Sequence, residues 1–342
     1  MREAQFRNKI TWFSFLFSLI VVWVHSYNAV LYLGEESLAA DLVSRMERGI
    51  SEGVGQIAVP GFFMISGYLF YRNCTWEKVG AKVKRRVRSV LVPYIVWNFL
   101  YYLGYVIASR LPWMGQVVGK GVIPFSLHGA VDAILHYTYN YVFWYLFQLV
   151  LLILLAPVLY PVLKNRGSRV MLLAALWVCV ARQIRLPYVN ADALIYYSAG
   201  AVLSMEAWGQ KQVEAPVHPW ILGSILVGLS VLCYWNGLRM AWIPGFVLCR
   251  LLGVAGVWLL IPGQSLPKAG SCMHMNFFLY ATHFAQVRLI NKAGARFFAG
   301  SPAVALGLYL FMPVLVLGVT WPVGTVLQRS LPRVWGMLNG GR

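Results

Sequence analysis

Apolar residues in this chain occur in long runs separated by short polar stretches, the pattern of a protein that crosses a membrane many times. A membrane-spanning helix needs roughly 20 largely apolar residues, and the chain has room for about ten with short loops. We therefore expect an all-α integral membrane protein, a bundle of about ten transmembrane helices forming one domain over residues 1–342. The predicted spans are about 10–33, 54–71, 89–109, 140–163, 169–182, 192–208, 218–236, 242–262, 271–291 and 302–326.

Composition supports this interpretation and sets the orientation. Hydrophobic residues make up 59% of the chain and charged residues only 12%, whereas soluble domains have about 45–50% and 25%. The net charge of +18 is explained by the excess of Lys and Arg on cytoplasmic loops, so it does not indicate nucleic-acid binding. Ten spans put both termini on one side, and most Lys and Arg fall there, which predicts cytoplasmic termini. The polar segment 34–53 is acidic and is interpreted as an outer loop.

The 5 cysteines and 6 histidines are scattered along the chain. Their positions match neither a disulfide framework nor the ligand spacing of a zinc site. The sequence therefore predicts no metal.

A polar stripe runs along the first predicted span, "ITWFSFLFSLIVVWVHSYNAVLYL". Hydrocarbon offers no partners to such residues, so the stripe must face the bundle interior or a wet cavity. Its ionisable member, His25, is either a helix-packing residue that makes an interhelical hydrogen bond or a functional group. Burial would keep its imidazole neutral and able to accept a proton, as a general base does. The stripe consists of Thr11, Ser14, Ser18, His25, Asn28 and Tyr32.

A second polar face lies in predicted span 271–291, where Asn276, Tyr280 and His283 align with Gln286 at helical spacing. His283 is a candidate for a second catalytic or substrate-binding group. A packing role, as hydrogen-bonding glue between helices, is the alternative.

Three other segments carry candidate features. Pro and Gly in span 54–71 indicate a kinked or broken helix. Trp144 and its neighbouring tyrosines fit either an interfacial aromatic belt or a wall for a sugar ring. The polar segment 72–88, interpreted as a cytoplasmic loop, is strongly basic. Topology, anionic lipids and a phosphorylated ligand gripped by arginines each account for its charge. Its cations are Arg72, Lys78, Lys82, Lys84, Arg85, Arg86 and Arg88.

Several ordered segments together resemble the acyltransferase 3 family of integral membrane acyltransferases. A histidine in the first span, His25, is the first of them. Each segment is degenerate alone, but the ordered set covers almost the whole chain. The others are "PGFFMISGYLF" at 60–70, "RRVRSVLVPYIVW" at 85–97, "FWYLFQLVLLILLAPVL" at 143–159 and "MNFFLYATHFAQVRLI" at 275–290.

The resemblance implies a bacterial, multi-pass enzyme of the cytoplasmic membrane that O-acetylates cell-surface glycans. The acyl donor would be cytoplasmic acyl-CoA, usually acetyl-CoA, and the acceptor a hydroxyl of a glycan or lipid-linked saccharide. His25 matches the essential first-span histidine, while Arg85 and Arg88 match the basic pair linked to donor binding. Many members have an arginine eleven positions before the histidine, where this chain has Ser14. Arg72 and Lys9 are candidates to supply that missing charge.

The expected function is thus acyl transfer, with His25 as general base or, in a covalent variant, as nucleophile. Asn28, Trp144, Tyr280 and His283 are candidate substrate-binding or supporting residues. The partners expected are acyl-CoA, the saccharide acceptor and membrane lipids. Two alternatives remain open at this point. One is a transporter or flippase for a lipid-linked sugar, where broken helices and intramembrane histidines are also found; the other is a non-catalytic membrane scaffold.

Overall fold

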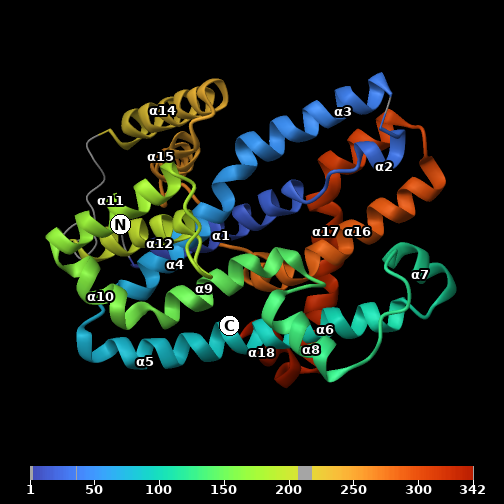
Figure 1. The fold of residues 1–342 in the computed structure, drawn as a ribbon, viewed down its shortest axis with the longest axis horizontal. Coiled ribbons are helices and arrows are strands. Elements are labelled where there is room, and N and C mark those ends of the chain that lie inside the picture. The colour runs from blue at the N-terminus through green and yellow to red at the C-terminus, as the bar shows by residue number, and fades with distance from the viewer. Residues whose placement is uncertain (1–2, 36, 207–217, 342) are drawn as a thin grey trace. The chain divides into compact units, whose positions relative to one another are not determined.

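The computed structural model describes residues 3–35, 37–206 and 218–341, and in these ranges the chain forms helices and turns without any strand (Figure 1). The residues group into two compact units. Unit 1 takes residues 1–17, 56–85 and 148–274, and unit 2 takes 18–55, 86–147 and 275–342. Helix α1 (Glu3–Val24) contributes residues to both.

The remaining helices of unit 1 are α4 (Ala58–Tyr71), α5 (Trp76–Arg86), α9 (Trp144–Leu154), α10 (Ala156–Lys164), α11 (Arg166–Ala181), α12 (Ala191–Met205), α14 (Pro219–Met240) and α15 (Ile243–Leu260), of which α5 and α9 each extend partly into unit 2. Those of unit 2 are α2 (Ala29–Leu33), α3 (Leu38–Arg48), α6 (Val92–Ala108), α7 (Pro112–Val118), α8 (Leu127–His136), α16 (Asn276–Phe298), α17 (Pro302–Ser330) and α18 (Pro332–Asn339).

Multi-pass membrane topology is supported, but the number of spans predicted from sequence is confirmed only in part. Every predicted span overlaps a helix. However, α11 and α12 have 16 and 15 residues, about 24 and 22 Å of helix, shorter than a hydrocarbon core of about 30 Å. In the described residues, six segments are long and apolar enough to cross a membrane, and the pair Leu127–His136 and Tyr141–Leu154, bent by 52°, is a further candidate. The six are Glu3–Leu33, Leu38–Tyr71, Trp76–Ala108, Pro219–Met240, Ile243–Leu260 and Pro302–Ser330.

A ten-helix transmembrane bundle and the cytoplasmic location of the termini therefore stay predictions. The last two residues of predicted span 192–208 lie outside the described residues.

Two polar segments interpreted as loops are in fact helical. Segment 34–53 contains α3, whose first turn is capped where the Ser37 hydroxyl accepts the N–H of Ala40 at 3.0 Å. The basic segment 72–88 contains α5, which runs through a π-turn, Val87–Leu91, into α6. The polarity of these segments predicts loops. However, Glu, Lys, Arg and Ala are good helix formers, so a polar segment between spans can also be helical.

The irregular backbone expected around Pro60 lies before it. A π-turn at Gly49–Gly53 and a 3₁₀ turn at Val54–Ile57 connect α3 to α4, and α4 itself runs unbroken from Ala58. Pro60 lies in the first turn of α4, where a missing N–H removes no helical hydrogen bond. The glycines and the proline therefore shape the entrance to this helix rather than break its middle.

Within unit 1, α4 and α12 pack with their backbones in direct contact. A Cβ atom at Gly67 would overlap the carbonyl oxygen of Tyr197, and one at Gly200 would overlap the carbonyl oxygen of Met64. Small residues that let backbones approach closely are a common basis of helix association in membranes. These two glycines therefore set the distance between the helices.

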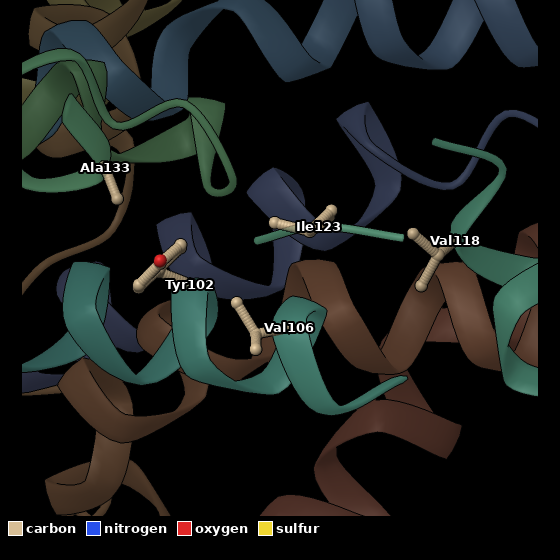
Figure 2. Packing of buried hydrophobic residues seen from close by; sticks show 5 residues of the cluster. All are labelled: Tyr102, Val106, Val118, Ile123 and Ala133. Carbon is tan, nitrogen blue, oxygen red and sulfur yellow. The ribbon is translucent and has the colours of Figure 1, made fainter. Parts of the chain in front are cut away.

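Within unit 2, a local core joins α6 to the segments that follow it. Tyr102 and Val106 on α6 pack with Val118 of α7, Ile123 of the next loop and Ala133 of α8 (Figure 2). The Tyr102 hydroxyl also donates to the carbonyl oxygen of Pro124 at 2.8 Å. The cluster anchors the loop between α7 and α8 on α6.

Replacing Gly200 with alanine should destabilise the protein by about 1–3 kcal/mol, because the added methyl overpacks the α4–α12 contact. Gly228→Ala is the matched control, since a Cβ at this exposed helical glycine meets nothing within 4 Å and alanine has the higher helix propensity. Thermal unfolding of the purified protein in detergent would compare the two. Equal midpoints for both variants would contradict the backbone contact.

Candidate active site

The backbone around His25 leaves the helical path. Helix α1 ends at Val24, His25 lies in the turn that follows, and residues 26–28 are irregular before the short helix α2 begins. The sequence predicts one continuous span over 10–33, but the structure breaks this helix after Val24. His25 therefore stands at the end of a helix rather than inside one.

A buried carboxylate holds this break in place. Glu47, on α3, is 1% exposed and accepts the backbone N–H groups of Asn28 at 2.9 Å and Ala29 at 3.4 Å. Those N–H groups have no helical partner because α2 begins there, and a carboxylate is a strong acceptor for them. The start of α2 is thus fixed by a residue from a different helix.

Two asparagines secure the same segment against α16 and α17. The side-chain amide of Asn28 donates to the carbonyl oxygen of Ala305 at 3.0 Å and to Oδ1 of Asn291 at 3.3 Å. Asn291 donates in turn to the carbonyl oxygen of Ser26 at 3.3 Å. The Asn28 amide nitrogen is therefore engaged within the protein, and this residue holds the backbone beside His25.

The imidazole of His25 contacts Tyr141, His283 and Phe284, all in unit 2. Its Nδ1 lies 2.8 Å from the hydroxyl of Tyr141, which comes from the 3₁₀ turn before α9. Its ring centroid lies 5.4 Å from that of His283 on α16. The two histidines that the sequence singled out, 258 positions apart along the chain, thus lie side by side.

The environment of His283 fixes its tautomer. Its Nδ1 lies 2.6 Å from the carbonyl oxygen of Tyr280, and a carbonyl can only accept, so Nδ1 carries the hydrogen. Nε2 then presents a lone pair. This Nε2 is buried and has no hydrogen-bond partner among the described residues. His283 therefore offers an acceptor atom beside His25.

Aromatic side chains surround the two imidazoles. Tyr280 donates its hydroxyl to the carbonyl oxygen of Val142 at 2.7 Å and stacks on Phe143 with ring centroids 5.6 Å apart. Phe284 meets the Tyr141 ring edge-on at 4.7 Å. The surroundings of the two imidazoles are therefore mostly aromatic, and their polar atoms include the tyrosine hydroxyls and the backbone carbonyl oxygens that these groups contact.

The other predicted site residues are divided between the two units. Arg72 and Arg85 belong to unit 1, whereas Arg88 and Trp144 belong to unit 2. Arg72 forms an ion pair with Glu3 at 2.7 Å, while Arg85 and Arg88 are exposed. Trp144 is the first residue of α9 and is partly buried.

Sequence reasoning did not single out Tyr141 or Glu47. Tyr141 lies in "YTYNYVFWY", and one tyrosine in such a run cannot be distinguished from the others by pattern alone. Glu47 lies in the segment taken for an outer loop, where an acidic residue is unremarkable. Glu47 lies seven residues after Ala40 and four after Val43, on the same face of α3. This spacing is the sequence signal that could have indicated its burial.

A metal centre is not formed by the residues that the structure describes, because no three His, Cys, Asp or Glu side chains gather there as a ligand set.

Comparisons with known proteins agree with the resemblance seen in the sequence. The family described as "Acyltransferase domain" matches residues 8–326. The succinoglycan biosynthesis protein ExoH of Rhizobium meliloti (strain 1021) is 22% identical over 313 residues, covering 86% of this chain and 81% of ExoH. No solved structure matches the chain significantly. Because the family match runs through both units and nearly the whole sequence, the chain belongs to the acyltransferase 3 family of membrane acyltransferases.

Proposed function

We propose that the protein is an O-acetyltransferase that moves an acetyl group from acetyl-CoA to a hydroxyl of a cell-surface glycan or lipid-linked saccharide. The observation that supports this proposal most directly is the contact between Nδ1 of His25 and the Tyr141 hydroxyl at 2.8 Å, beside the ring of His283. A relative named for succinoglycan biosynthesis supports a glycan acceptor. A bacterial cytoplasmic membrane is the location that goes with this proposal.

In the proposed reaction, His25 is the general base. Its Nδ1–H donates to the oxygen of Tyr141, which leaves the lone pair on Nε2 to accept a proton. Nε2 takes the proton of the acceptor hydroxyl as that oxygen attacks the thioester carbonyl. The carbon–sulfur bond then breaks, and the imidazolium returns the proton to the thiolate of CoA. An ester and free CoA are the products.

A covalent variant uses the same atoms. Nε2 of His25 attacks the thioester carbonyl, the carbon–sulfur bond breaks, and CoA leaves as a thiolate from an acyl-histidine. The acceptor hydroxyl then attacks the acyl carbonyl and the carbon–nitrogen bond breaks. The freed imidazole takes the hydroxyl proton and passes it to the thiolate. In either version, the lone pair of His283 Nε2 would accept a hydrogen bond from an acceptor hydroxyl and orient it. Both versions need His25.

We assign the phosphate groups of the donor to the arginines of the basic segment. Arg85 and Arg88 are exposed and lie three residues apart around the junction of α5 with the π-turn, and guanidinium groups bind phosphate oxygens in a fixed fork geometry. Arg72 is a weaker candidate, because Glu3 already takes its charge. The alternative of a transporter or scaffold predicts no consumption of acetyl-CoA at all.

His25→Ala should lower acetyl transfer by about 10²–10⁴-fold, the usual contribution of a general base. The assay uses protein purified in detergent, radiolabelled acetyl-CoA and an envelope-glycan fraction, and it follows free CoA and label in glycan. His128→Ala, at an exposed histidine on α8, is the control and should match wild type. Full activity of His25→Ala would refute both chemical versions, and well-folded wild type that does not bind acetyl-CoA would favour the transporter or scaffold.

Arg85→Gln and Arg88→Gln should each raise the KM for acetyl-CoA by about 10-fold, the value of one charge-assisted hydrogen bond. The turnover number at saturating donor should change little, because the reacting atoms are untouched. Arg329→Gln removes an exposed charge predicted to lie on the same face and serves as the control. An equal rise in KM for all three variants would show a general charge effect rather than a donor site.

Tyr141→Phe should lower the turnover number by roughly 10-fold while the KM for acetyl-CoA stays unchanged, because a lost hydrogen bond of about 1 kcal/mol frees the His25 ring to rotate. The phenyl ring keeps its contact with Phe284. Tyr137→Phe, at a partly buried tyrosine outside this contact, is the matched control. A normal turnover number for Tyr141→Phe would mean that this hydrogen bond does not orient the base.

A further inference from the structure

A group of cations and aromatic rings continues directly from the His25 pair within unit 2. The guanidinium carbon of Arg288 lies 5.8 Å from the ring centroid of Tyr105 and 5.7 Å from that of Phe284. The ammonium of Lys120 lies 5.3 Å from the Tyr139 ring and 5.8 Å from the Tyr105 ring. We call this the cation–aromatic cluster; it consists of Tyr105, Lys120, Tyr139, Tyr141, Phe284 and Arg288.

Tyr141 connects this cluster to the candidate base. Its hydroxyl contacts Nδ1 of His25 at 2.8 Å, and its ring contacts Phe284. The same Phe284 ring packs against the guanidinium group of Arg288. Phe284 contacts both the His25 ring and the Arg288 guanidinium. A ligand group held by Arg288 would therefore be separated from the His25 imidazole by a single side chain.

Arg288 contacts neutral groups in the part of the chain that the structure describes. Its hydrogen bond there goes to the hydroxyl of Tyr105, which uses one of five N–H donors. Among the described residues, neither Arg288 nor Lys120 forms an ion pair; in unit 2, Asp132 pairs with His136, and Glu47 accepts backbone N–H groups. The aromatic faces offset part of the cost of these charges.

The placement of Arg288 on α16 adds to this cost. Lys292 follows one helical turn later, and like charges at this spacing repel each other. Arg288 is partly buried, and a charge taken out of water without a counter-ion is costly. An anion bound at Arg288 would relieve both costs, and the guanidinium fork matches a carboxylate or a phosphate.

We propose that the acceptor is an anionic saccharide, and that Arg288, assisted by Lys120, binds its carboxylate or phosphate group while a sugar ring packs on the tyrosines. This rests on the proposed acyl transfer and names the acceptor class of that same site. The acceptor fits better than a lipid headgroup because the cluster adjoins His25, where the reacting hydroxyl must be. Tyr141 is also 49% exposed, which leaves its ring available to a ligand.

Binding can be tested without catalysis. An envelope-glycan fraction is radiolabelled and separated by anion exchange into anionic and neutral pools, and retention by the immobilised full-length protein is measured without acetyl-CoA. We expect the anionic pool to be retained, and Arg288→Gln to weaken this retention by about 10–100-fold, the worth of a hydrogen-bonded ion pair. Arg288→Lys, which keeps the charge, should restore part of it. Arg296→Gln, at an exposed arginine two turns along α16, should bind as wild type does.

Competition on wild-type protein decides the matter even if Arg288→Gln does not fold. Methyl glucuronide should displace the anionic pool and methyl glucoside should not, because they differ in one carboxylate. Displacement by phosphatidylglycerol vesicles in place of methyl glucuronide would assign Arg288 to a lipid headgroup and overturn the proposal. Equal retention of both pools, or wild-type retention by a folded Arg288→Gln, would overturn it as well.

The transfer assay separates this inference from the function on which it rests. In acetyl transfer to the anionic pool, Arg288→Gln should raise the acceptor KM and leave the turnover number at saturation nearly unchanged. Binding that depends on Arg288 without any acetyl transfer would refute the proposed function alone. Acetyl transfer that enters the neutral pool would refute the anionic acceptor alone.

Discussion

The hydrogen bonds from Asn28 and Ala29 to the buried carboxylate of Glu47 determine the shape of the chain beside His25. The apolar run that begins at Ile10 is long enough to continue as one helix to Leu33. Helix α1 instead ends at Val24. The N–H groups of Asn28 and Ala29, which a continued helix would direct to its own carbonyls, are held by Glu47 of α3. This carboxylate therefore fixes the backbone that follows His25.

Neither imidazole at the site touches a carboxylate among the described residues. Tyr141 contacts His25, and a backbone carbonyl contacts His283. In hydrolases that pair a histidine with a buried aspartate, the carboxylate stabilises the imidazolium that forms during the reaction. Here an imidazolium would have no such partner. In the proposed reaction the proton would therefore stay on His25 only briefly and pass on to the leaving thiolate.

Much of this fold could be predicted from sequence, because hydrophobic runs report helices directly. The pairing of His25 with His283 was within reach as well, since each stood out as an ionisable group in an apolar segment. The break after Val24 could not be predicted in this way. Glu47 holds the segment that follows the break, and no local sequence pattern links Glu47 to Asn28. Tyr141 was missed for the same reason: among several tyrosines, only the three-dimensional contact selects one. The sequence predicts an outer loop at 34–53 from its polarity and acidity, and these do not distinguish a connecting loop from a helix such as α3.

The close contact of α4 with α12 also has a consequence for how the protein is made. Gly67 enters the nascent chain long before Gly200, with α5 to α11 between them. At about 5–20 residues per second, the ribosome needs on the order of ten seconds to pass from Tyr71 to Ala191. During that interval the glycine face of α4 lacks the helix that will cover it. Translation speed over this stretch therefore sets how long α4 is exposed to wrong partners in the membrane.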